Sequence, residues 1–272
     1  MSKVWFVTGS ARGLGLSIVE AALKSGASVI ATARNPSQLQ PIVEKYGADK
    51  VLPLALDVSS NEQVIKAVNT GYEKFGRIDV VVNNAGYADV AAVEEVTIDN
   101  FHKQMDTDFY GVVYVTKAVL PILRQQGTGH IIQVSSLGGR VGTPGLSAYQ
   151  SAKWAIGGFS TVLSQEVAPL GIKVTVLEPG GIRTDWSGSS MNIPSISEPY
   201  KQTVGFWAEI LRDKAHNLIE PSRMADIVLK VSETEDPPLR LLIGSSAVNY
   251  AKQVGQALAA SDEKWYDLSV SA

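Results

Sequence analysis

The sequence predicts an α/β fold, in which a doubly wound parallel sheet of about seven strands is covered by helices on both faces. Three observations lead to this prediction. Short β-branched runs recur along the chain, and each is apolar over its length, as expected for strands buried on both sides. Spacers long enough for crossover helices separate the runs. No composition break or low-complexity linker interrupts the 272 residues, so we expect one domain over 1–272.

The expected strands follow one another in chain order. They are VWFVT (4–8), SVIAT (28–32), VLPLAL (51–56), DVVVN (79–83), HIIQVS (130–135), KVTVLE (173–178) and LRLLI (239–243). Two spacers begin with helix signals. SSNE at 59–62 has the pattern of a capping box, and Asn35 precedes Pro36, a residue favoured at the first helical position.

The segment after the sixth strand differs from the rest. Residues 184–199, TDWSGSSMNIPSISEP, are rich in Ser, Gly and Pro, and we expect them to begin a flexible substrate loop over about 184–215. The apolar residues that follow have mostly helical spacing, which ordinary core packing would explain. Alternatively, they roof a broad apolar pocket with Tyr87 and Trp186 nearby. These residues are Tyr200, Phe206, Trp207, Ile210 and Leu211.

Composition excludes several classes of function. A net charge of −3 without a run of Lys or Arg gives no basic surface that would bind nucleic acid. The absence of cysteine excludes disulfides, thiolate nucleophiles and Cys-based metal sites, and His102, His130 and His216 lie far apart, so we expect no metal. No apolar run approaches the length that spans a bilayer or forms a signal peptide, so we expect no membrane association and a cytoplasmic protein.

A glycine-rich stretch directly after the first strand predicts a dinucleotide site of the Rossmann type. TGSARGLG (8–15) has glycines at 9, 13 and 15, where the absence of side chains lets backbone N–H groups approach a diphosphate. The Gly-x3-Gly-x-Gly spacing differs from the G-x-G-x-x-G fingerprint, so the loop alone is a weak signal. The second strand is followed by Arg34, which together with Arg12 would suit the 2′-phosphate of NADP(H). A solvated arginine just past a strand is the alternative.

The pentapeptide YQSAK (149–153) suggests proton chemistry. Its Tyr149 and Lys153 are four residues apart, which places both side chains on one face of a helix. A phenol has an ordinary pKa of about 10, and a neighbouring cation would stabilise its phenolate. An amphipathic surface contact is the alternative for the pair alone.

Six motifs in order resemble the short-chain dehydrogenase/reductase family over about residues 3–260. They are TGSARGLG, LDV (56–58), NNAG (83–86), Ser136, YQSAK and PGGIRT (179–184). The stretches NNAGYADVAAVEEV, GHIIQVSS and VTVLEPGGIRTDW resemble most the NADP-linked members related to 17β-hydroxysteroid and retinol dehydrogenases.

The resemblance implies roles for individual residues. Tyr149 would be the general acid/base, Lys153 would assist it and hold the nicotinamide ribose, and Ser136, rather than Ser135, would bind the substrate oxygen. Asp57 would lie near adenine, Asn83 near the adenosine side, and Ile182 and Thr184 at the carboxamide. The implied cofactor-binding residues are Gly9, Ala11, Arg12, Gly13, Leu14, Gly15, Arg34, Asp57, Val58, Asn84, Ala85, Gly86, Tyr149, Lys153, Pro179, Gly180, Ile182 and Thr184.

One position departs from the family pattern. Asp108 replaces the asparagine that commonly supports a water chain to the catalytic lysine, which keeps an acceptor but removes an amide donor. We therefore consider two functions. The first is an NADP(H)-dependent oxidoreductase acting on a bulky, apolar ketone or secondary alcohol, and the alternative is a non-catalytic NADP-binding sensor. A serine hydrolase is disfavoured because no G-x-S-x-G elbow occurs. The family usually associates through two long helices, here about 98–125 and 148–168, so we expect a homodimer or homotetramer.

Overall fold

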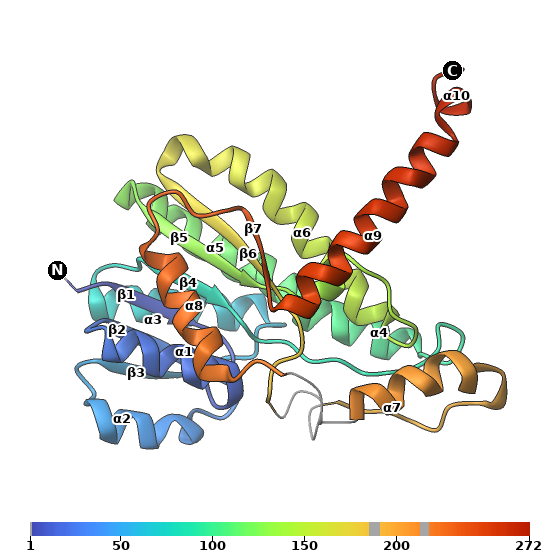
Figure 1. Cartoon of the computed structure of the whole chain (residues 1–272). Coiled ribbons are helices and arrows are strands. Elements are labelled where there is room, and N and C mark those ends of the chain that lie inside the picture. Colours follow the sequence, from blue (N-terminus) through green and yellow to red (C-terminus); the bar gives the residue numbers. More distant parts are fainter. Residues whose placement is uncertain (1, 185–190, 213–217) are drawn as a thin grey trace.

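Seven parallel strands form the centre of the structure in the order β3-β2-β1-β4-β5-β6-β7 (Figure 1). The computed structural model describes residues 2–184, 191–212 and 218–272. The strands are β1 Val4–Val7, β2 Ser28–Ala33, β3 Val51–Ala55, β4 Val80–Asn83, β5 Gly129–Val134, β6 Ile172–Pro179 and β7 Arg240–Ile243. The predicted fold class is confirmed. The strand order reverses between β1 and β4, which is where open α/β sheets bind ligands.

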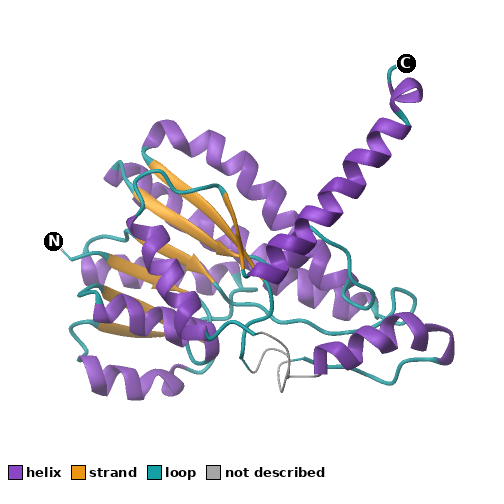
Figure 2. Ribbon diagram, in the orientation of Figure 1, coloured by secondary structure: helices purple, strands orange, loops and turns teal. Residues whose placement is uncertain are grey.

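Helices cover both faces of this sheet (Figure 2). One face packs against α1 (Gly13–Lys24), α8 (Pro221–Glu233) and the short α2 (Gln40–Tyr46). The other face packs against α3 (Asn61–Phe75), α5 (Gly111–Gln126) and α6 (Ser147–Val167). Alternate residues of β1 serve the two cores, since Trp5 and Val7 face α1 while Val4 and Phe6 face α3. Burial on both sides explains why the strands are apolar throughout.

The helix starts differ slightly from their sequence signals. Asn35 does cap a helical turn, and its side chain accepts a hydrogen bond from the Ser37 N–H at 3.1 Å, but the turn is a 3-10 helix, Pro36–Leu39, that leads into α2. The helix start expected at 59–62 lies one residue later, and it is no complete capping box, because the Gln63 side chain accepts from the Asp57 N–H at 2.9 Å. Ser60 is the N-cap of α3 and accepts from the Gln63 N–H at 3.3 Å, whereas the preceding Ser59 hydroxyl donates to Asp57.

The helix expected at 98–125 is interrupted. It consists of α4 (Ile98–Met105), a π-helical turn at Asp106–Tyr110, and α5. The extra residue of a π turn changes which side chains face inward, and such turns are frequent at functional sites. Here the turn places Asp108 in the interior, fully buried. The second long helix, expected at 148–168, is α6, with a 3-10 turn at Ala168–Leu170 after it.

The expected substrate loop lies partly outside the described residues, including Trp186. Its described part runs without regular structure from 191 to 197, then through a 3-10 turn (Glu198–Tyr200) and a π turn (Lys201–Gly205) into α7 (Phe206–Arg212). The residues buried in this segment are Met191, Val204 and Ala208, whereas Phe206 is 56% exposed. Core packing, one of the two explanations of the apolar spacing, therefore does not apply to Phe206.

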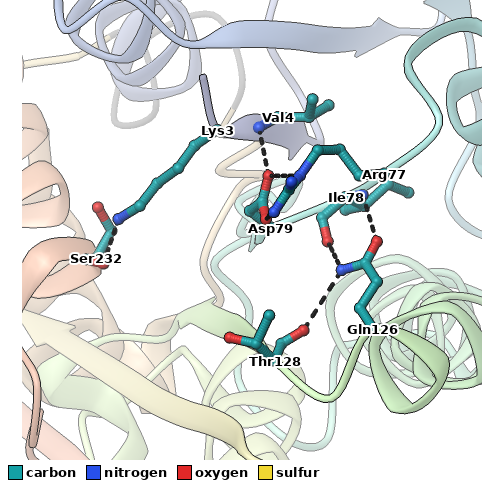
Figure 3. Close-up of polar contacts among 8 residues, drawn as sticks. All are labelled: Lys3, Val4, Arg77, Ile78, Asp79, Gln126, Thr128 and Ser232. Carbon is teal, nitrogen blue, oxygen red and sulfur yellow. Dashed lines mark hydrogen bonds and ion pairs between the residues drawn. The ribbon is translucent and has the colours of Figure 1, made fainter. Parts of the chain in front are cut away.

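Polar groups close the amino-terminal edge of the sheet (Figure 3). The Asp79 carboxylate accepts from the Val4 N–H at 2.8 Å and is bound through both oxygens by Arg77. The Gln126 amide pairs with both backbone groups of Ile78, at 3.0 and 2.7 Å. These side chains satisfy the backbone where the strands begin, which leaves the carboxyl edge for ligands.

The chain ends in a helical arm. It comprises α9 (Ser245–Lys264) and a short α10 (Tyr266–Ser269), and it projects away from the sheet and its covering helices (Figures 1 and 2). Ala247 is the buried residue of α9, and every residue from Gly255 onward is exposed. Among the helices that the structure describes, none is both long and apolar enough to cross a membrane.

Candidate active site

The glycine loop between β1 and α1 is shaped for close approach of a ligand. Gly9 and Gly13 have positive φ angles of 67° and 56°, which favour glycine. A side chain at position 15 is excluded for another reason, because a Cβ on Gly15 would lie 2.1 Å from the Gly9 carbonyl oxygen. The loop is thus a cradle that side chains would fill, and it suits a diphosphate at the start of α1.

The end of β4 is bonded to this loop. The Asn84 side-chain amide donates to the carbonyl oxygens of Thr8 and Gly9, at 2.9 and 3.2 Å. In return the Thr8 hydroxyl accepts from the backbone N–H groups of Asn84 and Ala85, at 2.9 and 3.0 Å. Asn83 instead bonds within the sheet, to the Gln133 side chain at 2.9 Å. Asn84, and not Asn83, therefore holds the glycine loop in place.

The segment after β6 lies on the other side of the loop. A Cβ on Gly13 would meet the Thr184 side chain at 3.4 Å, so Thr184 and the glycine loop are neighbours. The segment is anchored by the Gly180 N–H, which donates to the Ile243 carbonyl at 2.9 Å, and by a β-bridge between Ile182 and Ile219. These contacts bring the predicted carboxamide-binding residues to the diphosphate cradle.

Arg34 and Asp57, which are predicted to bind the adenosine half of the cofactor, are not bonded to the glycine loop as Asn84 is. Arg34 is exposed just after β2, where it can reach a ligand. The Asp57 carboxylate accepts from the backbone N–H and the hydroxyl of Ser59, at 3.0 and 2.7 Å. One of its oxygens is thus engaged in a local turn. Val58, next to it, packs behind Gly111 at the start of α5.

Tyr149 and Lys153 share one face of α6, as their spacing predicts. The Lys153 ammonium lies 5.4 Å from the centroid of the Tyr149 ring. Both side chains are buried, with residue exposures of 6% and 5%. The ammonium donates to the Val134 carbonyl at 3.1 Å, which fixes it at the end of β5. A solvated surface pair is excluded by this burial.

The two serines after β5 have separate tasks. Ser136 begins the 3-10 turn Leu137–Gly139, where its hydroxyl accepts from the Gly138 N–H at 3.0 Å. Its side chain is also hydrogen-bonded to Tyr149. Ser135 donates to the Lys153 carbonyl at 3.4 Å and so ties α6 to the sheet. The structure therefore places Ser136, the residue chosen by spacing, beside Tyr149.

Asp108 enters the same site from the π turn. One carboxylate oxygen accepts from the Tyr87 N–H at 3.0 Å. A Cβ built on Gly86 would lie 3.0 Å from this oxygen and 3.5 Å from the Lys153 ammonium. Asp108 and Lys153 therefore flank the same glycine, and a side chain at position 86 would separate them.

Burial is the largest cause of the pKa shifts of Asp108, Lys153 and Tyr149. It raises the pKa of Asp108 to about 6, although Lys153 and the Tyr87 N–H favour the carboxylate. It lowers the pKa of Lys153, against the attraction of Asp108. Burial also raises the pKa of the Tyr149 phenol, and the hydrogen bond from Ser136 opposes this only in part. The expectation that Lys153 lowers the pKa of Tyr149 is not met in the protein alone.

Comparison with known proteins identifies the family. A profile of the short chain dehydrogenases matches residues 3–192. The oxidoreductase BOA17 of Botryotinia fuckeliana is 64% identical over 273 residues, covering 100% of both chains. The chain belongs to the short-chain dehydrogenase family.

Solved structures of other short-chain dehydrogenases agree with this assignment. One from Streptomyces avermitilis is 33% identical, with a TM-score of 0.94 over 100% of this chain and 98% of that one. Another, from Burkholderia cenocepacia in complex with NADP, is 25% identical, with a TM-score of 0.75 over 100% of this chain and 98% of that one. The chain is thus an oxidoreductase by family.

A hydrophobic cluster beside the site of this dehydrogenase was not anticipated from the sequence. Tyr149 packs in it with small and aliphatic residues from three separate segments. They are Ala88, Val90, Ala92, Leu146, Met191, Val204 and Ala208. Their sequence signal is weak because the three segments are far apart in the chain. No group of acidic or histidine side chains in the described residues could hold a metal ion.

Proposed function

We propose that this chain is an NADP(H)-dependent oxidoreductase that transfers hydride between nicotinamide and a ketone or secondary alcohol. The observation that carries the proposal is the convergence of Tyr149, Ser136 and Lys153. The Ser136 and Tyr149 side chains are hydrogen-bonded, and the Lys153 ammonium lies over the Tyr149 ring. A phenol, a hydroxyl donor and a buried ammonium in one place suit proton exchange with a carbonyl oxygen.

Each of these residues has a distinct task in the proposed reaction. The bound cofactor supplies or accepts the hydride. In reduction, Tyr149 donates its proton to the carbonyl oxygen while Ser136 holds that oxygen by a hydrogen bond. The raised pKa of the phenol keeps it protonated at neutral pH, which suits the acid. In oxidation Tyr149 must lose its proton, and the positive charges of Lys153 and of the oxidised nicotinamide then favour the phenolate.

We propose NADP(H) as the cofactor because of the charge at the end of β2. Arg34 is exposed there, and Arg12 lies in the glycine loop. A charge-assisted bond to the 2′-phosphate contributes roughly 1.5–3 kcal/mol, about ten- to a hundredfold in affinity. The relative from Burkholderia cenocepacia was solved with NADP, which is consistent with this preference.

The surroundings of Tyr149 favour an apolar substrate. The cluster of small aliphatic residues next to the phenol, with the half-buried Tyr87 nearby, would accept a bulky apolar ketone or secondary alcohol. We further propose that the protein is cytoplasmic and forms a homodimer or homotetramer through α5 and α6. Exposed Trp154 and Val162 on α6 supply apolar surface for this contact.

The test is NADPH consumption, followed by absorbance, with a panel of aliphatic, aryl and steroid ketones. We expect turnover with at least one bulky ketone. Tyr149→Phe should lower kcat by about a hundredfold or more, because only the transferable proton is removed, and should leave NADPH binding nearly intact. Tight NADPH binding without turnover of any ketone would contradict the proposal and favour the sensor alternative.

A further inference from the structure

A buried carboxylate lies just outside the proposed catalytic group. Glu178 is next to the last residue of β6, and its side chain is fully buried. Two arginines satisfy it. The Nε of Arg140 contacts one oxygen, and Arg240 of β7 contacts the other through Nε at 2.8 Å and through Nη2. The two arginine side chains are themselves only 34% and 30% exposed.

Both arginines connect Glu178 to the turn that carries Ser136. Arg140 directly follows the 3-10 turn Leu137–Gly139, of which Ser136 is the N-cap. Arg240 also donates through Nη2 to the Gly139 carbonyl, at 3.2 Å. The turn is therefore held to β6 and β7 at its last residue and at the residue after it. The N-cap of the turn, Ser136, carries the hydroxyl that bonds Tyr149.

This arrangement is costly for a purely structural contact. A buried carboxylate needs several hydrogen bonds to offset its loss of hydration, and packed apolar residues often give equal stability. What the ion pairs add is a fixed orientation, since an Arg–carboxylate contact is directional. Misplacement of a reacting group by about 1 Å can lower a rate by about a hundredfold. Glu178 also immediately precedes Pro179 and Gly180 of the proposed cofactor segment.

We propose that Glu178, through Arg140 and Arg240, is a positioning residue that sets the Ser136 hydroxyl against the substrate oxygen. The inference rests on the proposed function. It makes a prediction that a role in stability alone does not make. The effect of removing the Glu178 charge on kcat must pass through Ser136, so it should disappear once the Ser136 hydroxyl is absent.

The experiment is a double-mutant cycle with Glu178→Gln and Ser136→Ala, measured with NADPH and a ketone that the wild type reduces. We expect Glu178→Gln to lower kcat by about tenfold or more, with KM for NADPH within about twofold of wild type. In the Ser136→Ala background the same change should lower kcat by less than about twofold.

Asp79→Asn is the matched control. Asp79 is also a buried carboxylate bound by an arginine through both oxygens, but it lies at the opposite edge of the sheet. We expect it to lower the unfolding temperature without changing kcat per folded molecule. If Glu178→Gln does not fold, Arg140→Gln removes only one of the contacts at a half-exposed side chain, and the same cycle applies to it.

Additive effects of Glu178→Gln and Ser136→Ala, or a kcat unchanged as in Asp79→Asn, would overturn the positioning role while leaving the oxidoreductase intact. A wild type that reduces no ketone would overturn the proposed function, and this inference with it. The two failures are distinguishable because only the second is seen in the unmodified protein.

Discussion

The charge of a single side chain, Asp108, changes within the ordinary range of pH. With its pKa raised to about 6 by burial, it is largely neutral at pH 5 and largely ionised at pH 8. Its negative charge contributes to the raised pKa of Tyr149 and opposes the lowered pKa of Lys153. The effect on phenolate formation is therefore confined to the side of the profile above pH 6.

We predict that Asp108→Asn shifts the pH dependence of alcohol oxidation to lower pH. The amide keeps the acceptor for the Tyr87 N–H but removes the charge that disfavours the phenolate, so Tyr149 should lose its proton at lower pH. Lys153 loses an ionic neighbour and partly offsets this gain. The measurement is kcat/KM for oxidation from pH 5 to 10. Profiles that superimpose above pH 6 would show that the Asp108 charge is not felt at the phenol.

A second residue prediction concerns cofactor choice. Arg34→Asp should reverse the preference between NADPH and NADH, because the new carboxylate repels a 2′-phosphate and accepts from a 2′-hydroxyl. We expect the ratio of kcat/KM values to change by about a hundredfold or more, from two contributions of roughly 1.4 kcal/mol or more. The matched control is Arg124→Asp, at an exposed arginine in the last turn of α5. Equal ratios in wild type and Arg34→Asp would place Arg34 away from the cofactor.

The sequence identified the residues whose partners are local or follow a fixed motif. Tyr149 and Lys153 are adjacent on a helix, and Ser136 lies at a family spacing from them. Glu178 was not identified, because its partners Arg140 and Arg240 are 38 and 62 residues away and only the sheet brings them together. The raised pKa of Tyr149 was also missed, since burial is a property of the whole fold.

At the scale of elements, the strands were predictable and the helix interior was not. Every expected strand is present within one residue of its predicted ends, because burial on both faces leaves a continuous apolar run. The π turn at Asp106–Tyr110 changes only the hydrogen-bond register, which leaves no mark in composition. Its consequence is nonetheless large, since it turns Asp108 inward.

The glycine loop allows a prediction with an internal control. In Gly15→Ala the new methyl group would collide with the Gly9 carbonyl, so we expect weaker NADPH binding by about tenfold or more and a lower unfolding temperature. Gly158→Ala lies on an exposed part of α6, where the single chain leaves open space around it, and should leave NADPH binding unchanged. NADPH titration and thermal unfolding measure both. Unchanged binding in Gly15→Ala would show that the cradle can widen freely.

At the scale of the whole molecule, the sheet with its covering helices, here called the body, could be predicted from the sequence. The helical arm of α9 and α10 could not. No element after the strand at 239–243 is predicted from the sequence, and the direction of α9 depends on where its few contacts with the rest of the chain end. Beyond Val254 no side chain of the arm is buried in this chain. The arm therefore contributes little to the folding of the body around the sheet.

We predict that a chain ending at Val254 unfolds within about 2 °C of the full chain and retains its kcat/KM for NADPH, because no buried apolar surface is removed. Thermal unfolding and steady-state kinetics measure the two quantities, and a chain ending at Lys264 is the control for truncation itself. A marked loss of stability, or a smaller mass by light scattering, would show that the arm packs on another copy of the chain.

The polar closure at the amino edge of the sheet has a practical consequence for enzyme engineering. Asp79, Arg77 and Gln126 satisfy backbone groups where the strands begin, whereas the proposed catalytic residues lie where strands end. Libraries aimed at heat tolerance can therefore be targeted to the first edge and libraries aimed at new substrates to the second. The two sets share no side chains, so beneficial changes from each should combine additively. Heat tolerance and substrate range can therefore be improved in the same variant.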